Sequence, residues 1–421
     1  MKLFERLFKH ITLAFLLCFF APSTASSPNN EPTLQADSIE ISLLTCGPRQ
    51  QVYSLYGHTA IRFQDKQTGR DIAINYGVFS FDQPFFVLRF VFGLTDYEMG
   101  IAPFDIFEWE YGPTGCGVRQ QVLNLTAQEK MAIAQAVDRN MEPQNRVYRY
   151  NFFYDNCTTR ARDIIADNLN GRIVYDTSTP QHHNTPAQYP TFRNLIHNYN
   201  ETHRWARFGN DLLLGVKADY NTTFEQQQFL PERLYADFER AHIISADGTK
   251  RNLVSSSFWL FEPTTKQQST QQTNMSILDV FSPLVTFSIL SILTLIIAIV
   301  EYRRKRIIWV FDTSLMLTTG ACGLLLFAMI FSQHPTVSLN LQILLLNPIN
   351  IFMLYSVTKA ARQNRIHWWT KAWSALILLL LAGSFLQSYA EGITIVALSL
   401  LLRNISNIYT FKNTGSKQPE A

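Results

Sequence analysis

Hydrophobic residues gather near the two ends of the chain, and the longer of these regions is at the C-terminal end. Most of the apolar runs there are long enough to cross a hydrocarbon core of roughly 30 Å. We therefore expect a domain of about five transmembrane helices within residues 277–410. The last run is the weakest because Arg403 interrupts it, so we expect a tilted short helix whose arginine reaches the membrane surface. The runs cover residues 277–300, 307–331, 339–358, 372–389 and 392–409.

The polar connections between these runs differ in charge. Residues 301–306 and 358–365 read EYRRKR and TKAARQNR, whereas residues 332–340 and 388–392 contain no Lys or Arg. Basic loops stay on the cytoplasmic side of a membrane. The region before the first run is therefore expected outside the cytoplasm, and the tail at residues 411–421 inside it.

The apolar run at the N-terminus is shorter. It follows the basic stretch MKLFERLFKH, covers residues 11–21 and ends in small residues around Ala25. A basic start, a short apolar core and a small-residue exit are typical of a secretory signal peptide. We expect residues 1–25 to be such a signal, cleaved after Ala25, with an uncleaved membrane anchor as the alternative.

Between these ends, residues 26–263 have the pattern of one mixed domain. Alternating apolar and polar residues predict strands, and the last of these strands leads into a helix for which Thr126 is the natural N-cap. The sequence therefore indicates an α+β domain, followed by a polar linker at residues 264–276. The strands are expected at residues 38–46, 57–65, 70–81 and 114–126, and the helix at residues 127–141.

One stretch of this domain, YNFFYDNCTTRARDI at residues 150–164, sets a cysteine at an expected helix start. Apolar residues at helical spacing follow it, so Asn156 is the natural N-cap and Cys157 the first helical residue. The unpaired N–H groups and aligned dipoles of a helix N-terminus favour the thiolate, which is the nucleophilic form of cysteine. The same N–H groups can form an oxyanion hole. The expected supporting residues are Tyr154, Asp155, Asn156 and Arg160.

A cysteine at a helix start is more often a packing residue, but the cysteine count favours a free thiol here. Oxidising compartments join cysteines in pairs. Residues 26–263 contain three cysteines, an odd number that leaves at least one unpaired. A disulfide between Cys46 and Cys116 would leave Cys157 free, and the sequence alone leaves that pairing open.

Acyl transfer by a cysteine also needs a base within hydrogen-bond reach, usually a histidine. His58 follows a glycine at the start of an expected strand. Alternation places His58 with Ala60 and Arg62 on one face of that strand and the bulky apolar residues on the other. His58 therefore need not lie among core residues, and it is the candidate base.

The other histidines do not indicate a metal centre. Adjacent histidines seldom ligate one ion, and no carboxylate stands at a recognised spacing from them. The net charge of +3 is largely explained by the basic loops between the membrane runs, so nothing indicates a nucleic-acid partner. We expect lipids as partners and no metal. The histidines concerned are His182, His183, His197 and His203.

The order of a strand histidine in YGHTAIRF followed by DNCTTR at a helix start resembles the permuted papain-like arrangement. That group includes permuted NlpC/P60 proteins and the lecithin:retinol acyltransferase family. The resemblance implies this fold, with Cys157 as nucleophile and His58 as base. It also implies a polar residue on the following strand that orients the imidazole. Asn75 in INYGVF is the candidate for this third role, with Tyr76 and Asp155 as alternatives.

Over roughly residues 38–260 the chain is more closely similar to the Lnb-type bacterial lipoprotein N-acyltransferases, through phrases such as ISLLTCGP, INYGVFSF and NFFYDNCTTRARDII. This resemblance implies a multi-pass protein of the bacterial inner membrane with its catalytic domain in the periplasm. An acyl chain would move from a phospholipid to Cys157 as a thioester. It would then pass to the α-amine of the N-terminal diacylglyceryl-cysteine of a lipoprotein. The implied partners are phospholipid, diacylated lipoprotein and bilayer, and the implied chemistry needs no cofactor.

Two other functions stay open. A Cys–His pair also serves amidases and peptidases that cut cell-wall peptides, and a non-catalytic membrane sensor or scaffold could keep both residues for structure. A His58 imidazole far from the Cys157 sulfur would exclude both enzyme functions. Contact between them would not choose between acyltransferase and amidase.

One aromatic segment, FDQPFFVLRFVFGLTDY at residues 81–97, is unusually apolar. We expect it either to dip into the bilayer or hold an acyl chain, or to form a buried strand or helix.

Overall fold

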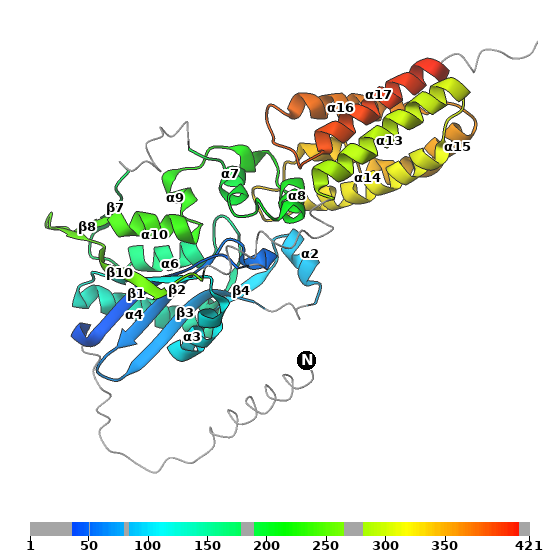
Figure 1. Ribbon diagram of the computed structural model, residues 1–421. Helices are drawn as coiled ribbons and strands as arrows, with labels where there is room; N and C mark the ends of the chain where they lie inside the picture. The colour runs from blue at the N-terminus through cyan, green and yellow to red at the C-terminus, as the bar shows by residue number, and fades with distance from the viewer. Residues whose placement is uncertain (1–35, 50, 80–83, 178–188, 265–280, 412–421) are drawn as a thin grey trace, which may run out of the picture. The chain divides into compact units, whose positions relative to one another are not determined.

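The computed structural model describes residues 36–49, 51–79, 84–177, 189–264 and 281–411 (Figure 1). The expected signal peptide lies outside the described residues, as do nearly all of the expected linker and cytoplasmic tail. His182 and His183 are also outside them.

The N-terminal part of the chain is built around an antiparallel sheet of seven strands in the order β10-β5-β1-β2-β3-β4-β6 (Figure 1). Across the centre of this sheet, Cys46 pairs with His58 and Ala60 pairs with Asn75. The strands expected from alternation are β1, β2, β3 and β5 of this sheet. A second sheet has three short strands. The bounds are β1 (Ile39–Cys46), β2 (His58–Asp65), β3 (Arg70–Val78), β4 (Asp96–Pro103), β5 (Val118–Leu123), β6 (Val147–Arg149) and β10 (Val254–Phe261), with β7 (Arg172–Val174), β8 (His242–Ile244) and β9 (Lys250–Asn252) in the second sheet.

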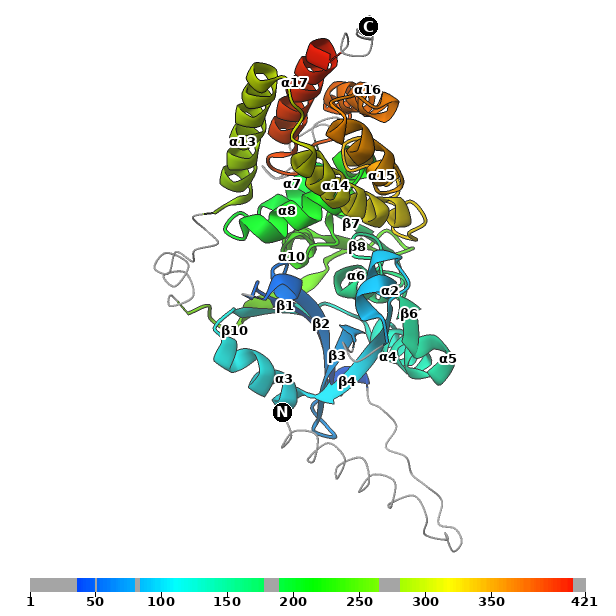
Figure 2. The ribbon, with the colours of Figure 1, turned by 90° about the vertical axis from the view of Figure 1, so that its right-hand side faces the viewer.

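Helices cover both faces of the large sheet. On one face lies α3 (Phe104–Tyr111), whose Phe104 and Phe107 pack against Ala60 and Ala73. On the other face lie α4 (Ala127–Met141) and α6 (Cys157–Ala166), as Figure 2 shows. The face of β2 that carries His58 is therefore also covered. The alternation along β2 divides its residues between two buried faces of the sheet, and not between a buried face and a solvent-exposed one.

The start of one helix agrees with the capping signal in the sequence. Helix α4 begins at the expected cap: the Thr126 hydroxyl accepts the Glu129 N–H, and the Glu129 carboxylate accepts the Thr126 N–H. The aromatic segment at residues 81–97 contains α2 (Phe86–Val91) and the start of β4. The remaining helices are α5 (Pro143–Arg146), α7 (Phe192–His197), α8 (Arg204–Leu213), α9 (Phe224–Gln227) and α10 (Pro231–Arg240).

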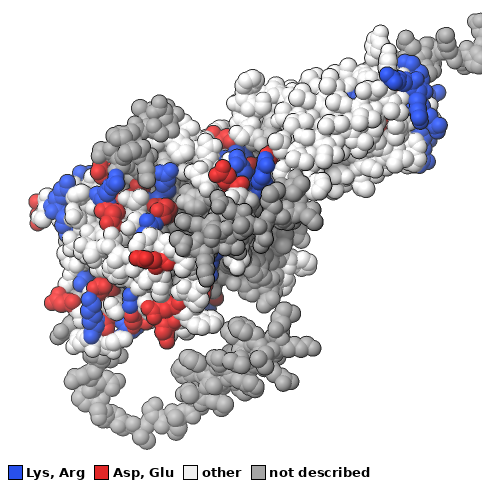
Figure 3. Space-filling view, in the orientation of Figure 1, with Lys and Arg blue, Asp and Glu red and all other residues white. Residues whose placement is uncertain are grey.

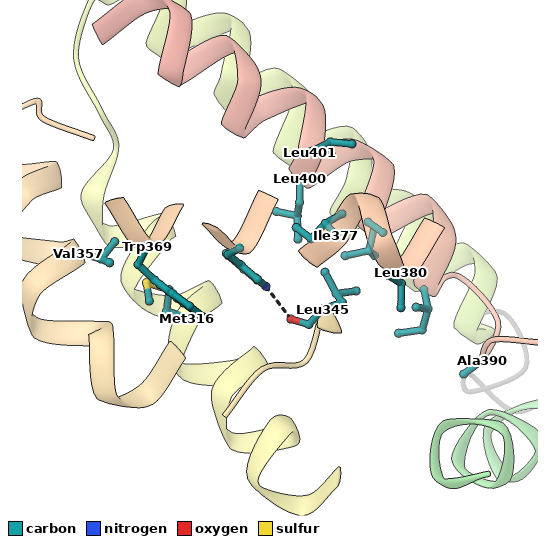
Figure 4. Packing of buried hydrophobic residues seen from close by; sticks show 13 residues of the cluster. Met316, Leu345, Val357, Trp369, Ile377, Leu380, Ala390, Leu400 and Leu401 are labelled. Carbon is teal, nitrogen blue, oxygen red and sulfur yellow. Dashed lines mark hydrogen bonds between the residues drawn. The ribbon is translucent and has the colours of Figure 1, made fainter. Parts of the chain in front are cut away.

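The C-terminal part is helical. Among the described residues, four segments are long and apolar enough to cross a membrane, where about five were expected. The fifth helix, α16, is apolar but shorter. Figure 4 shows its Ile377 and Leu380 in the shared core of these helices, beside Leu400. The bounds are α13 (Pro283–Arg304), α14 (Trp309–Met329), η6 (Leu341–Leu344) leading into α15 (Ile349–Arg362), α16 (Trp368–Gly383) and α17 (Ile393–Phe411).

Arg403 corrects one expectation. It does not reach outward to the membrane surface but is fully buried in a complete α17 helix. Its guanidinium donates to Glu301 at 2.9 Å and to Asp312 at 2.6 Å. A charge within an apolar bundle is stabilised by internal partners of opposite charge, and the carboxylates of α13 and α14 supply them. In Figure 3 the other basic side chains of the helical part gather at one end of it.

Hydrogen bonds join the sheet domain to the helical part of the chain. The Gly215 N–H donates to the Thr336 carbonyl at 2.8 Å, and the Asn340 amide donates to the Leu212 carbonyl at 2.8 Å. Phe208 and Leu212 of α8 also pack against the core of the membrane helices. Helix α8 and the residues that follow it therefore attach the sheet domain to the membrane helices and to the loops between them.

Candidate active site

The candidate nucleophile stands at the start of α6, where Asn156 closes the helix end. The Asn156 side-chain oxygen accepts the N–H groups of Thr158 and Thr159 at 2.9 and 3.0 Å. Its amide nitrogen donates to the carbonyls of Phe152 and Phe229 at 3.1 and 3.0 Å. All side-chain hydrogen-bonding groups of this buried residue are therefore engaged in holding the loop that carries Cys157.

The Cys157 thiol and the His58 imidazole lie close enough together for each to shift the pKa of the other. Burial opposes the thiolate, but the neighbouring imidazole, with the Thr59 N–H and the Thr158 hydroxyl, outweighs it and lowers the pKa of Cys157 to about 7. Burial likewise opposes a charged imidazole, yet the thiolate and Asn75 raise the pKa of His58. Thr59 and Thr158 join their hydroxyls at 3.0 Å, which fixes the end of β2 against α6.

Asn75 occupies the third position of this group. Its side-chain oxygen lies 3.0 Å from His58 Nε2. A carbonyl oxygen only accepts, so Nε2 carries the proton and Nδ1 is the nitrogen left for Cys157. The Tyr111 ring stacks against the His58 imidazole, with the two ring centroids 6.4 Å apart.

The two alternatives for the third position are engaged elsewhere. The Tyr76 hydroxyl accepts a hydrogen bond from Asn140 at 2.9 Å. The Asp155 carboxylate forms two hydrogen bonds with Arg160, at 2.6 and 2.8 Å. Neither of these groups orients the His58 imidazole.

The expected supporting residues are arranged around α6 and do not point at the sulfur. The Arg160 guanidinium, held by Asp155, lies 3.5 Å from the centroid of the Tyr148 ring. The Tyr154 ring is exposed and makes an edge contact with Phe192 at 5.3 Å. Arg160, bonded to Asp155, therefore packs against Tyr148.

Tyr148 is the residue that the sequence did not single out. Its hydroxyl is buried and has no hydrogen-bond partner among the described residues. A Cβ built on Gly77 would lie 3.8 Å from the Cys157 Cβ and 3.9 Å from this hydroxyl, so the glycine separates the two by a small gap. In the sequence, Tyr148 is marked only as an aromatic residue two positions before Tyr150. Its pairing with Tyr97 on β4 is long-range, so no local pattern could have identified it.

The other cysteines of the sheet domain differ from Cys157. Cys46 and Cys116 are buried in one apolar cluster with Phe107 and Tyr111, and both are free thiols. Burial raises the pKa of Cys46. Cys157 is thus the cysteine of this domain that is both partly accessible and activated.

Of the histidines considered for metal binding, two are described. The His197 ring bonds to Asp211 at 2.8 Å and to Arg207 at 2.9 Å, and the His203 ring bonds to Thr202 at 3.1 Å. The described residues contain no group of three or more His, Cys, Asp or Glu side chains arranged to hold a metal ion.

Together these features define a class: a membrane protein whose α+β domain carries a half-buried Cys–His–Asn group and is joined to membrane-spanning helices. The Lnb N-terminal periplasmic domain matches residues 27–198, and the Lnb transmembrane domain matches residues 272–414. The chain belongs to the Lnb family, and this membership indicates an enzyme. No curated protein and no solved structure matches the chain.

Proposed function

We propose that this protein is a lipoprotein N-acyltransferase of the bacterial inner membrane that works through a thioester on Cys157. The observation that carries the proposal is the contact between Cys157 and His58, with Asn75 on the far side of the imidazole. Family membership and attachment to membrane helices support lipids as the substrates. The donor is a membrane phospholipid and the acceptor a diacylated lipoprotein.

In the first step, Cys157 Sγ attacks the ester carbonyl of the phospholipid while His58 Nδ1 holds the thiol proton. A C–S bond forms and gives a tetrahedral oxyanion. When the oxyanion collapses, the ester C–O bond breaks and His58 gives the proton to the departing lysolipid alcohol. The acyl chain is then a thioester on Cys157.

In the second step, the α-amine of the diacylglyceryl-cysteine attacks the thioester carbonyl. His58 accepts a proton from the amine, a C–N bond forms, and the C–S bond breaks to release the Cys157 thiolate. An ester and an amine have become an alcohol and an amide, so the balance needs no metal, nucleotide or redox partner.

Both steps pass through an oxyanion, and two donors are suited to it. Asn156 occupies the N–H groups of Thr158 and Thr159, which leaves the Cys157 N–H as the donor of this helix end that has no partner in the described part of the chain. The Tyr148 hydroxyl, buried and without a partner among the described residues, is the side-chain donor that we assign. Asp155 and Arg160 keep its ring in place.

The alternatives are weaker on specific observations. A scaffold has no use for a cysteine whose pKa is lowered to about 7 against the effect of burial. A cell-wall amidase could use the same group, but it does not need a sheet domain braced against membrane helices by buried hydrogen bonds.

The test is to express the protein in cells depleted of their usual lipoprotein N-acyltransferase and to examine lipoprotein N-termini by mass spectrometry. We expect amide-linked chains with the wild-type protein and free α-amines with Cys157→Ala or His58→Ala. Free α-amines with the wild-type protein would overturn the proposal.

A further inference from the structure

Helix α2 leaves apolar side chains uncovered. Phe85, at its N-terminal end, is 78% exposed and Leu88 is 55% exposed. Phe85 also has a positive φ of 57°, an unusual conformation for a bulky residue. An exposed aromatic residue in a strained backbone conformation indicates a functional surface.

The other end of α2 is fastened to the membrane part of the chain. The Gln333 N–H donates to the Phe92 carbonyl at 2.9 Å, and the His334 ring bonds to the Phe90 carbonyl at 3.2 Å. Both residues belong to the loop that follows α14, the loop expected on the periplasmic side. Helix α2 therefore lies at the level where α14 leaves the membrane.

Exposed apolar side chains also lie at the end of α14, the helix that leads into this loop. Phe331, two residues before Gln333, is 67% exposed, and Phe327 and Ile330 are exposed as well. On a helix matched by a transmembrane domain, such side chains face lipid. The hydrogen bond between Gln333 and Phe92 places the end of α2 beside this lipid-facing surface.

The same loop reaches the candidate active site. The His334 ring lies 4.6 Å from the Phe152 ring, centroid to centroid. The Phe152 carbonyl in turn accepts the hydrogen bond from Asn156, the cap of the helix that begins with Cys157. Helix α2 and Cys157 are thus connected through three residues, His334, Phe152 and Asn156.

We infer that Phe85 and Leu88 insert into the outer leaflet of the membrane and make α2 an interfacial anchor beside Cys157. The partner is the acyl region of the phospholipid bilayer. The only charged side chain of the helix, Arg89, fits this placement because it is held by Asp96 at 3.0 Å on the domain side. Aromatic and aliphatic residues on one side of a short interfacial helix are the composition that such binding requires.

This inference extends the proposed function and, in its consequence for catalysis, rests on it. A phospholipid ester lies at the boundary between headgroup and chain, so its carbonyl must leave the bilayer to meet Cys157. Side chains inserted beside the site would loosen the local chain packing and guide one chain toward the sulfur.

Insertion is tested on the full-length protein in phosphatidylethanolamine–phosphatidylglycerol vesicles. Leu88→Cys, in a background with Cys157→Ser and Cys322→Ser, is labelled with an environment-sensitive fluorophore, and quenchers are attached to lipid chains. The matched control is Ile106→Cys on α3, since Ile106 is aliphatic and 52% exposed. We expect quenching at position 88 and none at position 106. Equal quenching at both positions, or none at position 88, would overturn the inference.

A protein partner is a separate outcome. If the label at position 88 were shielded only after a lipoprotein is added, α2 would bind the acceptor protein and the inference would be wrong. Because this measurement uses a protein without Cys157, its result does not depend on whether the proposed acyl transfer occurs.

The functional arm uses Phe85→Asp and Leu88→Asp. With donor phospholipid in vesicles we expect each change to lower the transfer rate about tenfold, the effect of one buried apolar side chain, while Ile106→Asp leaves it unchanged. Unchanged transfer in both α2 variants would contradict the guiding role. Absence of transfer in the wild-type protein would contradict the proposed function instead.

Discussion

At the scale of single residues, the candidate site depends on a balance between burial and charge. Burial alone would keep Cys157 as a thiol and His58 as a neutral ring. Their mutual contact reverses both tendencies, so the pKa of Cys157 is lowered to about 7 and the pKa of His58 is raised. Asn75 determines which imidazole nitrogen takes part.

This balance predicts the pH dependence of thiol reactivity. A lowered pKa means that the thiolate, and hence alkylation by iodoacetamide, increases as the pH rises through about 7. His58→Ala removes the main lowering influence, so the midpoint moves upward and the rate at neutral pH falls by about tenfold or more. Asn75→Ala is expected to move the midpoint in the same direction by a smaller amount. A midpoint that is the same in all three proteins would show that His58 does not activate Cys157.

Tyr148 gives a prediction in which stability and activity change in opposite directions. A buried hydroxyl without a partner destabilises a fold, so Tyr148→Phe is expected to leave the free energy of unfolding unchanged or raise it by about 1 kcal/mol. Because the variant loses a donor to the oxyanion, the transfer rate is expected to fall about 100-fold. Thermal unfolding in detergent and a transfer assay measure the two effects.

The control for this change is Tyr76→Phe. The Tyr76 hydroxyl accepts the hydrogen bond from Asn140, so its removal is expected to lower the free energy of unfolding by about 1 kcal/mol. A Tyr148→Phe variant with wild-type activity would remove Tyr148 from the mechanism.

At the scale of elements, helix ends and strand register assemble the site. The start of α6 positions the sulfur, and β2 and β3 position the histidine and the amide. Asn156 matters more than an ordinary cap because it also donates to the Phe152 and Phe229 carbonyls.

Asn156→Ala is therefore expected to cost about 2–4 kcal/mol of unfolding free energy, from the lost cap and the two carbonyls left without a donor. It should also slow the alkylation of Cys157. Thr126→Ala is the matched control, since Thr126 caps α4 in the same way, and it should cost about 1 kcal/mol and leave alkylation unchanged. Equal effects of the two changes on alkylation would contradict the special role of Asn156.

The parts of the structure that follow from local signals were predictable from the sequence. Strand alternation located β1, β2, β3 and β5, and cap residues located the starts of α4 and α6. The helix α3 was not predicted, because it has neither a distinct period nor a cap. Asn75 was proposed from a family resemblance, and its contact with His58 depends on the register between β2 and β3. Tyr148 and Arg403 depend on partners far along the chain, which no local pattern encodes.

At the scale of the whole molecule, the sheet domain and the membrane helices act as one support for the cysteine loop. Phe153 in that loop shares a buried cluster with Phe192 of α7 and with Met329 at the end of α14. Polar side chains at the same junction are also buried and paired. Gln342 is fully buried, donates to the Asp211 carbonyl at 2.9 Å and accepts the Ala390 N–H at 3.0 Å.

Gln342→Leu is expected to lower the free energy of unfolding by about 2 kcal/mol, because it leaves the Ala390 N–H without a partner in a buried position. Thermal unfolding of the full-length protein in detergent measures this loss. Gln67→Leu, at an exposed turn, is the control and should change stability by less than about 0.5 kcal/mol. Equal stability of the two variants would show that the junction contributes little.

The central claim is that Cys157 carries an acyl chain between donor and acceptor. Full-length protein is mixed with phospholipid without a lipoprotein acceptor, and its intact mass is measured. The account predicts a mass increase of one acyl chain that maps to Cys157, is removed by hydroxylamine, disappears when a diacylated lipoprotein peptide is added and is absent from Cys157→Ala. Transfer of a chain to the peptide by a protein that never carries one on Cys157, or by Cys157→Ala, would contradict it.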